Sequence, residues 1–95
     1  MSQAAIKRRM NRAKKAARMI LSSPKGSCEV TLLENHAFHI LAEREKEVRK
    51  IRVVLDKITR DDEDAVRRAR LPENFTREIW CRKLNGEFSV KIIKP

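Results

Sequence analysis

Three carboxylates and one lysine are the side chains of this sequence that best fit metal-assisted hydrolysis of a phosphate ester. Glu29, Glu43 and Asp56 could converge on a Mg²⁺ ion, with Lys57 next to Asp56. Hard cations need two or three converging oxygen ligands, so the residue types suit such a site. The chain also holds 13 Asp and Glu in 95 residues, and carboxylates at that density are common on surfaces and in salt bridges. Both interpretations stay open at the level of sequence.

The two histidines and two cysteines favour structural roles. His36 and His39 are three residues apart, which puts them on opposite faces of a strand. On a helix, both could bind the same metal ion. We expect a turn histidine and a partly buried strand histidine. Cys28 and Cys81 stand alone, without a CxxC pair, so we expect reduced, buried thiols in a cytoplasmic protein.

Positive charge is concentrated at the start of the chain. The net charge is +10, yet the segment before Cys28 contains no acid at all. A folded core does not need such a segment, whereas a polyanion explains it, because neutralised phosphates release condensed counterions. A solvated face, a protein partner and a membrane-surface helix are the alternatives. The predicted phosphate contacts are Lys7, Arg8, Arg9, Arg12, Lys14, Lys15 and Arg18, with a second patch of Arg49, Lys50 and Arg52.

The basic segment has the period of a helix. Ile6, Met10, Ala13, Ala17 and Ile20 form one apolar stripe at a period of 3.6 residues, and the cations occupy the other faces. A loose basic arm needs no such period. We therefore predict that residues 1–23 form an amphipathic helix docked on the rest of a single domain that spans residues 1–95.

Membrane spans and secretory signals are not expected. No apolar run approaches the roughly 20 residues of a span, and the basic start has no continuous apolar segment. A mitochondrial transit peptide is also basic and poor in acids, so it remains an alternative to a cytoplasmic protein without membrane contact.

Residues 37–58 carry two conflicting patterns. Leu41, Val48, Ile51, Leu55 and Ile58 fit a heptad and favour a helix. The runs 38–41 and 51–55 are rich in strand-forming residues, and the charged stretch between them would then be the tip of a hairpin. Residue pattern alone leaves the two alternatives equal.

The flanking segments are clearer. The alternation over residues 28–32 predicts a strand, and 34–36 reads as a turn. Thr59, with Asp62 three residues later, predicts the start of a helix that Pro72 ends. Asn85-Gly86 between two strand-like runs predicts a type I′ hairpin over residues 77–93.

Two runs resemble the central hairpin of a known superfamily. Phe38-His39-Ile40-Leu41-Ala42-Glu43, then a charged turn and Arg49-Lys50-Ile51-Arg52-Val53-Val54, resemble strands of the restriction-endonuclease-like nucleases, the PD-(D/E)XK superfamily, especially its small Holliday-junction-resolvase-like members. Glu78-Ile79-Trp80-Cys81 resembles a later strand that often carries Trp. The resemblance covers about residues 5–93 and favours strands at 37–43 and 48–55. It implies an α+β fold: an N-terminal basic helix, a three-stranded antiparallel sheet, a second helix and a C-terminal strand pair.

At the positions that the resemblance aligns with a metal site, this chain does not carry the residues that the superfamily uses. Two acids bind Mg²⁺ in that superfamily and a lysine polarises water, but the corresponding positions here are His39, Arg52 and Val54. We therefore expect a nuclease-like domain that binds nucleic acid, DNA rather than RNA, without a cofactor or catalysis. One alternative is a Mg²⁺-dependent endonuclease with a displaced site drawn from Glu29, His39, Glu43, Asp56 and Lys57. The other is a homodimeric interaction module that pairs through residues 88–92.

Overall fold

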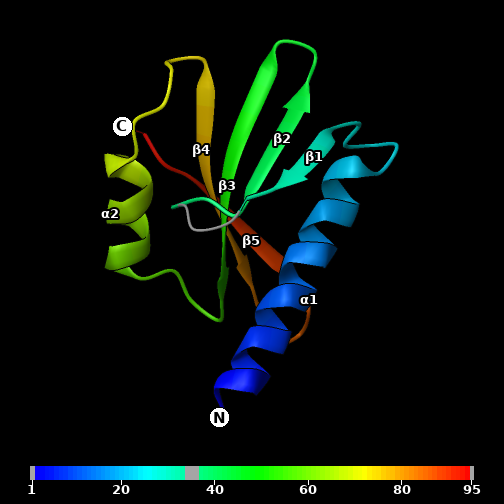
Figure 1. The fold of residues 1–95 in the computed structure, drawn as a ribbon, viewed down its shortest axis with the longest axis vertical. Helices are drawn as coiled ribbons and strands as arrows, with labels where there is room; N and C mark the ends of the chain where they lie inside the picture. The colour runs from blue at the N-terminus through cyan, green and yellow to red at the C-terminus, as the bar shows by residue number, and fades with distance from the viewer. Residues whose placement is uncertain (1, 34–36, 95) are drawn as a thin grey trace.

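Two helices cover opposite faces of one five-stranded sheet in the computed structural model (Figure 1). The structure describes residues 2–33 and 37–94, so the predicted turn at 34–36 and its His36 lie outside the described residues. Among the described residues, no helix is both long and apolar enough to cross a membrane. The elements in chain order are α1 (Gln3–Ser22), β1 (Glu29–Leu32), β2 (Ile40–Arg44), β3 (Glu47–Leu55), α2 (Arg60–Arg68), β4 (Phe75–Arg82) and β5 (Phe88–Ile92).

The sheet is mixed, with the strands in the order β1-β2-β3-β4-β5. All neighbouring pairs are antiparallel except β3 and β4, which run parallel with Val53 opposite Trp80. The crossover through α2 brings the chain back to start β4 beside β3, as a parallel pair requires. The three-stranded antiparallel part and the C-terminal pair predicted from sequence are both present. The expectation of two separate units is wrong, because parallel pairing joins them into one sheet. The C-terminal hairpin forms, but the type I′ turn predicted for it is wrong. That turn needs a positive φ at both central residues, and Gly86 has one (90°) whereas Asn85 does not. The turn is closed instead by a hydrogen bond from the Gly86 N–H to the Lys83 carbonyl oxygen, at 2.9 Å.

Residues 37–58 form the hairpin rather than the helix. β2 and β3 pair with Arg44 opposite Glu47, and Glu45 at the tip has a positive φ of 50°. The heptad alternative is wrong because the apolar side chains divide between the two faces of β3. Ile51 and Val53 pack in the cluster that includes Ala17 of α1, while Val54 packs in the cluster that includes Val66 of α2. A central strand that is buried on both faces has a nearly continuous run of apolar residues instead of alternating apolar and polar ones.

Helix α1 docks on the sheet through small residues. Ala13, Ala17 and Leu21 are buried against Ile40 and Val53, and a stripe of alanines allows the helix to approach closely. The predicted stripe is confirmed at its centre but not at its ends, where Ile6 and Ile20 are 46% and 49% exposed. Leu21 takes the buried position expected for Ile20, because the contact follows the i, i+4 row of the helix.

Helix α2 begins where the sequence predicts and ends earlier. Thr59 and Asp62 form the reciprocal capping box. The helix stops at Arg68, before Pro72, and the buried Arg77 guanidinium donates hydrogen bonds to the carbonyl oxygens of Val66 and Ala69. A cation at these orphan carbonyl groups satisfies them and complements the helix dipole, so β4 itself caps α2.

The two cysteines are free thiols on opposite faces of the sheet. Cys28 packs in the cluster under α1, and Cys81 packs in the cluster under α2. Burial raises the pKa of Cys81, which disfavours the reactive thiolate. The sequence-based prediction of buried, unbridged thiols is confirmed.

Candidate functional site

The solvent side of α1 carries most of its positive charge. Lys7, Arg8, Arg12, Lys15 and Arg18 are exposed, and Lys14 is partly buried. We call these six residues the α1 basic surface. Within residues 2–33 and 37–94, none of them lies within ion-pair distance of a carboxylate. Because the helix is docked on the sheet, the backbone positions that carry these charges are fixed relative to the rest of the domain.

Arg9 is the α1 cation that the fold neutralises. Its guanidinium donates two hydrogen bonds to the Asp56 carboxylate, at 2.7 and 3.3 Å. These bonds raise the pKa of Arg9 and lower that of Asp56. Asp56 was predicted to bind a metal ion and Arg9 to contact phosphate, but the fold pairs the two side chains with each other.

The predicted second patch is not one surface. Arg49 faces α1 and donates two hydrogen bonds of 2.7 Å to Glu78. Arg52 lies on the other face and bonds to Asp62 at 3.0 Å. Successive side chains of a strand point to opposite faces, so three neighbours on β3 cannot act together. Lys50 shares the face of Arg52 and has no ion pair with any described residue.

Glu78 is a buried charge that sequence reasoning missed. Its side chain is 2% exposed and also accepts hydrogen bonds from Thr76 and from the Trp80 indole, at 2.9 and 3.1 Å. Burial by itself would raise the pKa of Glu78, but the hydrogen bonds from Arg49 and Trp80 outweigh it and hold the pKa below its usual range. The i, i+2 spacing of Thr76, Glu78 and Trp80 was the available signal, because it puts all three on one face.

Three of the predicted catalytic residues gather in a groove at the end of β3. His39, Asp56 and Lys57 line this groove together with Arg52 and Asp62. We call it the β3 groove. His39 Nδ1 accepts a hydrogen bond from the Val53 N–H at 2.9 Å. Burial, with the positive charges of Lys14 and Arg52, lowers the pKa of His39 to about 4, so the ring is neutral at pH 7.

The other two predicted catalytic residues lie elsewhere. Glu29 and Glu43 are direct cross-strand partners on β1 and β2. Glu43 is four residues along the strand from His39, which is about 13 Å at the rise of a strand. The predicted cluster of Glu29, Glu43 and Asp56 is therefore not assembled, since the hairpin places its members at opposite ends of β2.

The residues of the β3 groove do not fit a divalent cation. The resemblance would put its ligands at His39 and Arg52, and Arg52 brings a positive charge that is held there by Asp62 and by the carbonyl oxygen of Ala37. In the part of the chain that the structure describes, no three His, Cys, Asp or Glu side chains are grouped to hold a metal.

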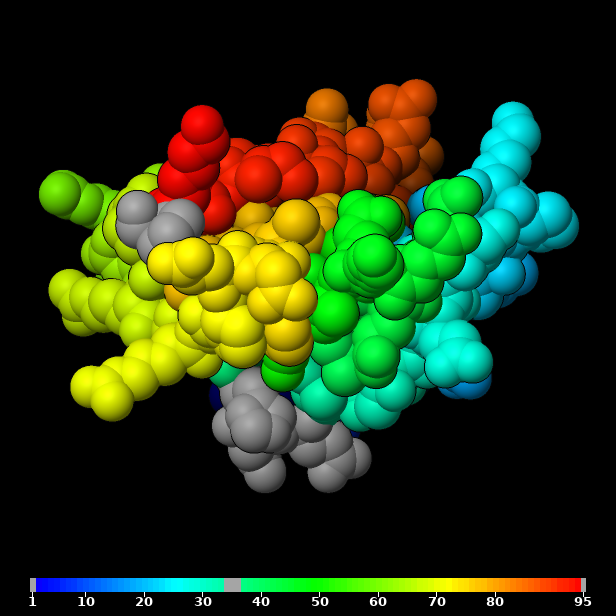
Figure 2. Space-filling model, turned by 90° about the horizontal axis from the view of Figure 1, so that it is seen from above, coloured from blue at the N-terminus to red at the C-terminus, as the bar shows by residue number. Residues whose placement is uncertain are grey.

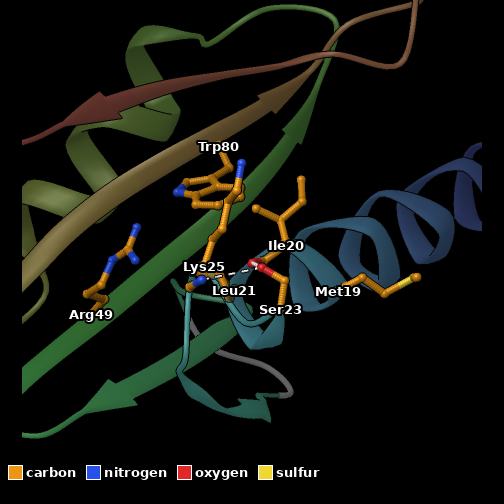
Figure 3. Close-up of a pocket in the computed structure, with 8 residues that line it drawn as sticks. Met19, Ile20, Leu21, Ser23, Lys25, Arg49 and Trp80 are labelled. Carbon is orange, nitrogen blue, oxygen red and sulfur yellow. Dashed lines mark hydrogen bonds between the residues drawn. The ribbon is translucent and has the colours of Figure 1, made fainter.

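An apolar hollow lies beside the C-terminal end of α1. Figure 3 shows Ile20 and Leu21 of α1 and Trp80 of β4 around it, with Lys25 and Arg49 at its rim. Trp80 and Phe88 pack edge to face with ring centroids 5.4 Å apart. α1 packs mainly over β1, β2 and β3, which leaves this side of β4 and β5 without a helix over it.

Comparison of the chain with protein-family models, with curated proteins and with solved structures finds no match. Inferences about function therefore rest on the residues and geometry given above.

Proposed function

We propose that this domain binds the phosphate backbone of nucleic acid through the α1 basic surface and does not cleave it. The observation that carries the proposal is that six cations of a docked helix have no carboxylate partner among the described residues. The order of elements, a helix, three strands, a second helix and a strand pair, is the order that the resemblance implies, and it adds some support to a nucleic-acid partner. Phosphate contacts position a protein without reading sequence, so binding is sequence-independent.

Counterion release sets the expected size of the effect. Each phosphate that is neutralised on duplex DNA contributes about 0.9 to the slope of log K against log salt. If all six cations of the surface engage, affinity falls roughly 10³-fold between 50 and 200 mM salt. A plain solvated surface has no such dependence.

The test is fluorescence anisotropy with a labelled duplex over that salt range. We expect Arg8→Gln/Lys15→Gln to lower the slope by about 1.8, because two phosphate contacts are lost. The matched control is Arg68→Gln/Arg70→Gln, which removes the same charge from exposed residues on and just after α2. A flat salt response, or equal effects of the two variants, refutes the proposal. An RNA duplex measured in parallel tests the expectation of DNA.

The absence of cleavage has its own test. The same duplex incubated with Mg²⁺ or Mn²⁺ should stay intact. Metal-dependent cleavage that Glu43→Ala abolishes would contradict this part of the proposal and favour the displaced nuclease site.

A homodimer through β5 is a second candidate, favoured by the exposed edge of the sheet. β5 is the last strand of the sheet and lies along one side of the molecule in Figure 2. Val90 and Ile92 are 48% and 58% exposed on the side that α1 leaves open. With Val90 on a two-fold axis, Phe88 would face Ile92 of a second copy, and Ser89 would face Lys91, so that no like charges are opposed.

Sedimentation equilibrium decides this second candidate. A dimer mass that Val90→Lys reduces to the mass of one chain supports it, because lysines would then face each other across the axis. A single-chain mass for the unchanged protein contradicts it.

A further inference from the structure

A small hollow between α1 and the β4–β5 turn is lined by cations from both elements. The hollow has a volume of about 220 Å³ and is lined by Arg9 and Arg12 of α1 and by Arg82 and Lys83 at the start of the β4–β5 turn. Its other lining residues are Leu55, Leu84 and Gly86, so the lining includes no carboxylate. We call it the hairpin hollow. At about 30 Å³ per water molecule, it has room for a solvated anion group.

Three of the four cations keep their hydrogen-bond donors unused. Arg9 is engaged by Asp56, as described above. Within residues 2–33 and 37–94, the side chains of Arg12, Arg82 and Lys83 donate no hydrogen bond and form no ion pair. The hollow therefore collects positive charge that its described neighbours do not balance.

The Arg82 guanidinium is held in place by packing. It lies over the Phe88 ring, 4.8 Å from the ring centroid. A stacked guanidinium uses its face for the contact and keeps its N–H groups at the edge for a ligand. The hairpin that carries it is fixed by the positive φ of 90° at Gly86 and by the hydrogen bond from the Lys83 N–H to the Glu87 carbonyl oxygen.

We propose that the hairpin hollow is a phosphate-binding subsite, in which Arg12, Arg82 and Lys83 together hold one or two phosphodiester groups of a nucleic-acid backbone. An arginine with a free edge and a lysine are the donors that suit phosphate oxygens, the first by paired hydrogen bonds and the second as a point charge. Glu87 is the acid of this hairpin and is not among the lining residues. Like charges brought together by the fold repel one another, and a bound phosphate relieves that repulsion.

This inference rests on the proposed function and extends it. The interface becomes a continuous surface formed by α1 and the β4–β5 turn, rather than one helix. Arg12 belongs to both parts, because it is the member of the α1 basic surface that points toward the hairpin hollow.

The test is the salt dependence of duplex binding by Arg82→Gln/Lys83→Gln. We expect the slope of log K against log salt to fall by about 1.8 and affinity at 0.1 M salt to fall by about 60-fold. Arg68→Gln/Arg70→Gln removes the same charge elsewhere and should leave the slope unchanged. Because Arg82 packs on Phe88, Lys83→Gln alone is measured as well; it leaves this packing intact and should lower the slope by about 0.9.

The outcomes separate this inference from the proposed function. If the unchanged protein does not bind the duplex, both fail. If Arg8→Gln/Lys15→Gln lowers the slope but the hairpin variants do not, the subsite is overturned and the function of α1 stands.

A titration with inorganic phosphate, followed by amide chemical shifts, distinguishes the two sources of phosphate. Tight binding of the free ion at the hairpin, lost in Arg82→Gln/Lys83→Gln while duplex binding is unchanged, would overturn the assignment to a nucleic-acid backbone. Competition of the duplex with the free ion at these amides supports the assignment.

Discussion

Replacing Asp56 with Asn should tighten the binding of nucleic acid. Asp56 is the carboxylate that engages an α1 cation, and its loss would release Arg9 beside the hairpin hollow. Asp56 has a positive φ of 68°, a conformation that Asn tolerates well, so the exchange removes charge without straining the backbone. The side chain is 47% exposed, and an ion pair so open to solvent contributes little to the stability of the fold.

The magnitude follows from one additional phosphate contact. The slope of log K against log salt should increase by about 0.9, which corresponds to roughly eightfold tighter binding at 0.1 M salt. The measurement is fluorescence anisotropy with the same labelled duplex. Asp61→Asn is the matched control, because it removes an exposed carboxylate from the first turn of α2. Equal gains from both variants would show an effect of net charge alone, and weaker binding by Asp56→Asn would refute the reasoning.

Three further predictions concern the scaffold. Glu78→Gln should lower the free energy of unfolding by about 2–3 kcal/mol in urea titration, because it leaves the Arg49 charge partly buried without its partner; a loss below 0.5 kcal/mol would contradict it. Since folding lowers the pKa of His39 from 6.5 to about 4, the unfolded chain binds more protons between these values. Stability should therefore fall as pH drops from 6.5 toward 4. His39→Asn, whose side-chain oxygen can still accept the backbone N–H, should reduce that slope; parallel curves would argue against it. Gly26→Ala should destabilise the fold by roughly 1–3 kcal/mol, because a Cβ there would lie 2.3 Å from the Leu21 carbonyl oxygen; thermal melting checks this, and an unchanged midpoint would refute it.

Local signals in the sequence predicted most of the helices and turns. The capping pair of Thr59 and Asp62 marked the start of α2, and Asn85-Gly86 marked the last hairpin. The end of α2 was not predictable in this way, because the residue that caps it, Arg77, belongs to the next strand, β4, and reaches the helix only in the folded chain. Residue pattern also left 37–58 undecided, since a strand buried on both faces loses the alternation that would identify it.

The candidate site was predicted only in part for a similar reason. His39, Asp56 and Lys57, which were predicted as part of a displaced metal site, line one groove, but Glu29 and Glu43 do not join them. The register of the β2–β3 hairpin separates the two groups, and register depends on the whole sheet. Glu78 and the hairpin hollow had no sequence signal strong enough to single them out.

The sequence by itself determined that a basic, amphipathic helix begins the chain, because charge and a period of 3.6 residues are local properties. Only the tertiary structure decided which cations have partners. Arg9 meets Asp56 across 47 residues, and Arg49 meets Glu78 across 29. Such pairs depend on strand order and register, which bring distant segments together. The same folding leaves six cations of α1 without a carboxylate partner among the described residues and places Arg82 and Lys83 beside Arg12.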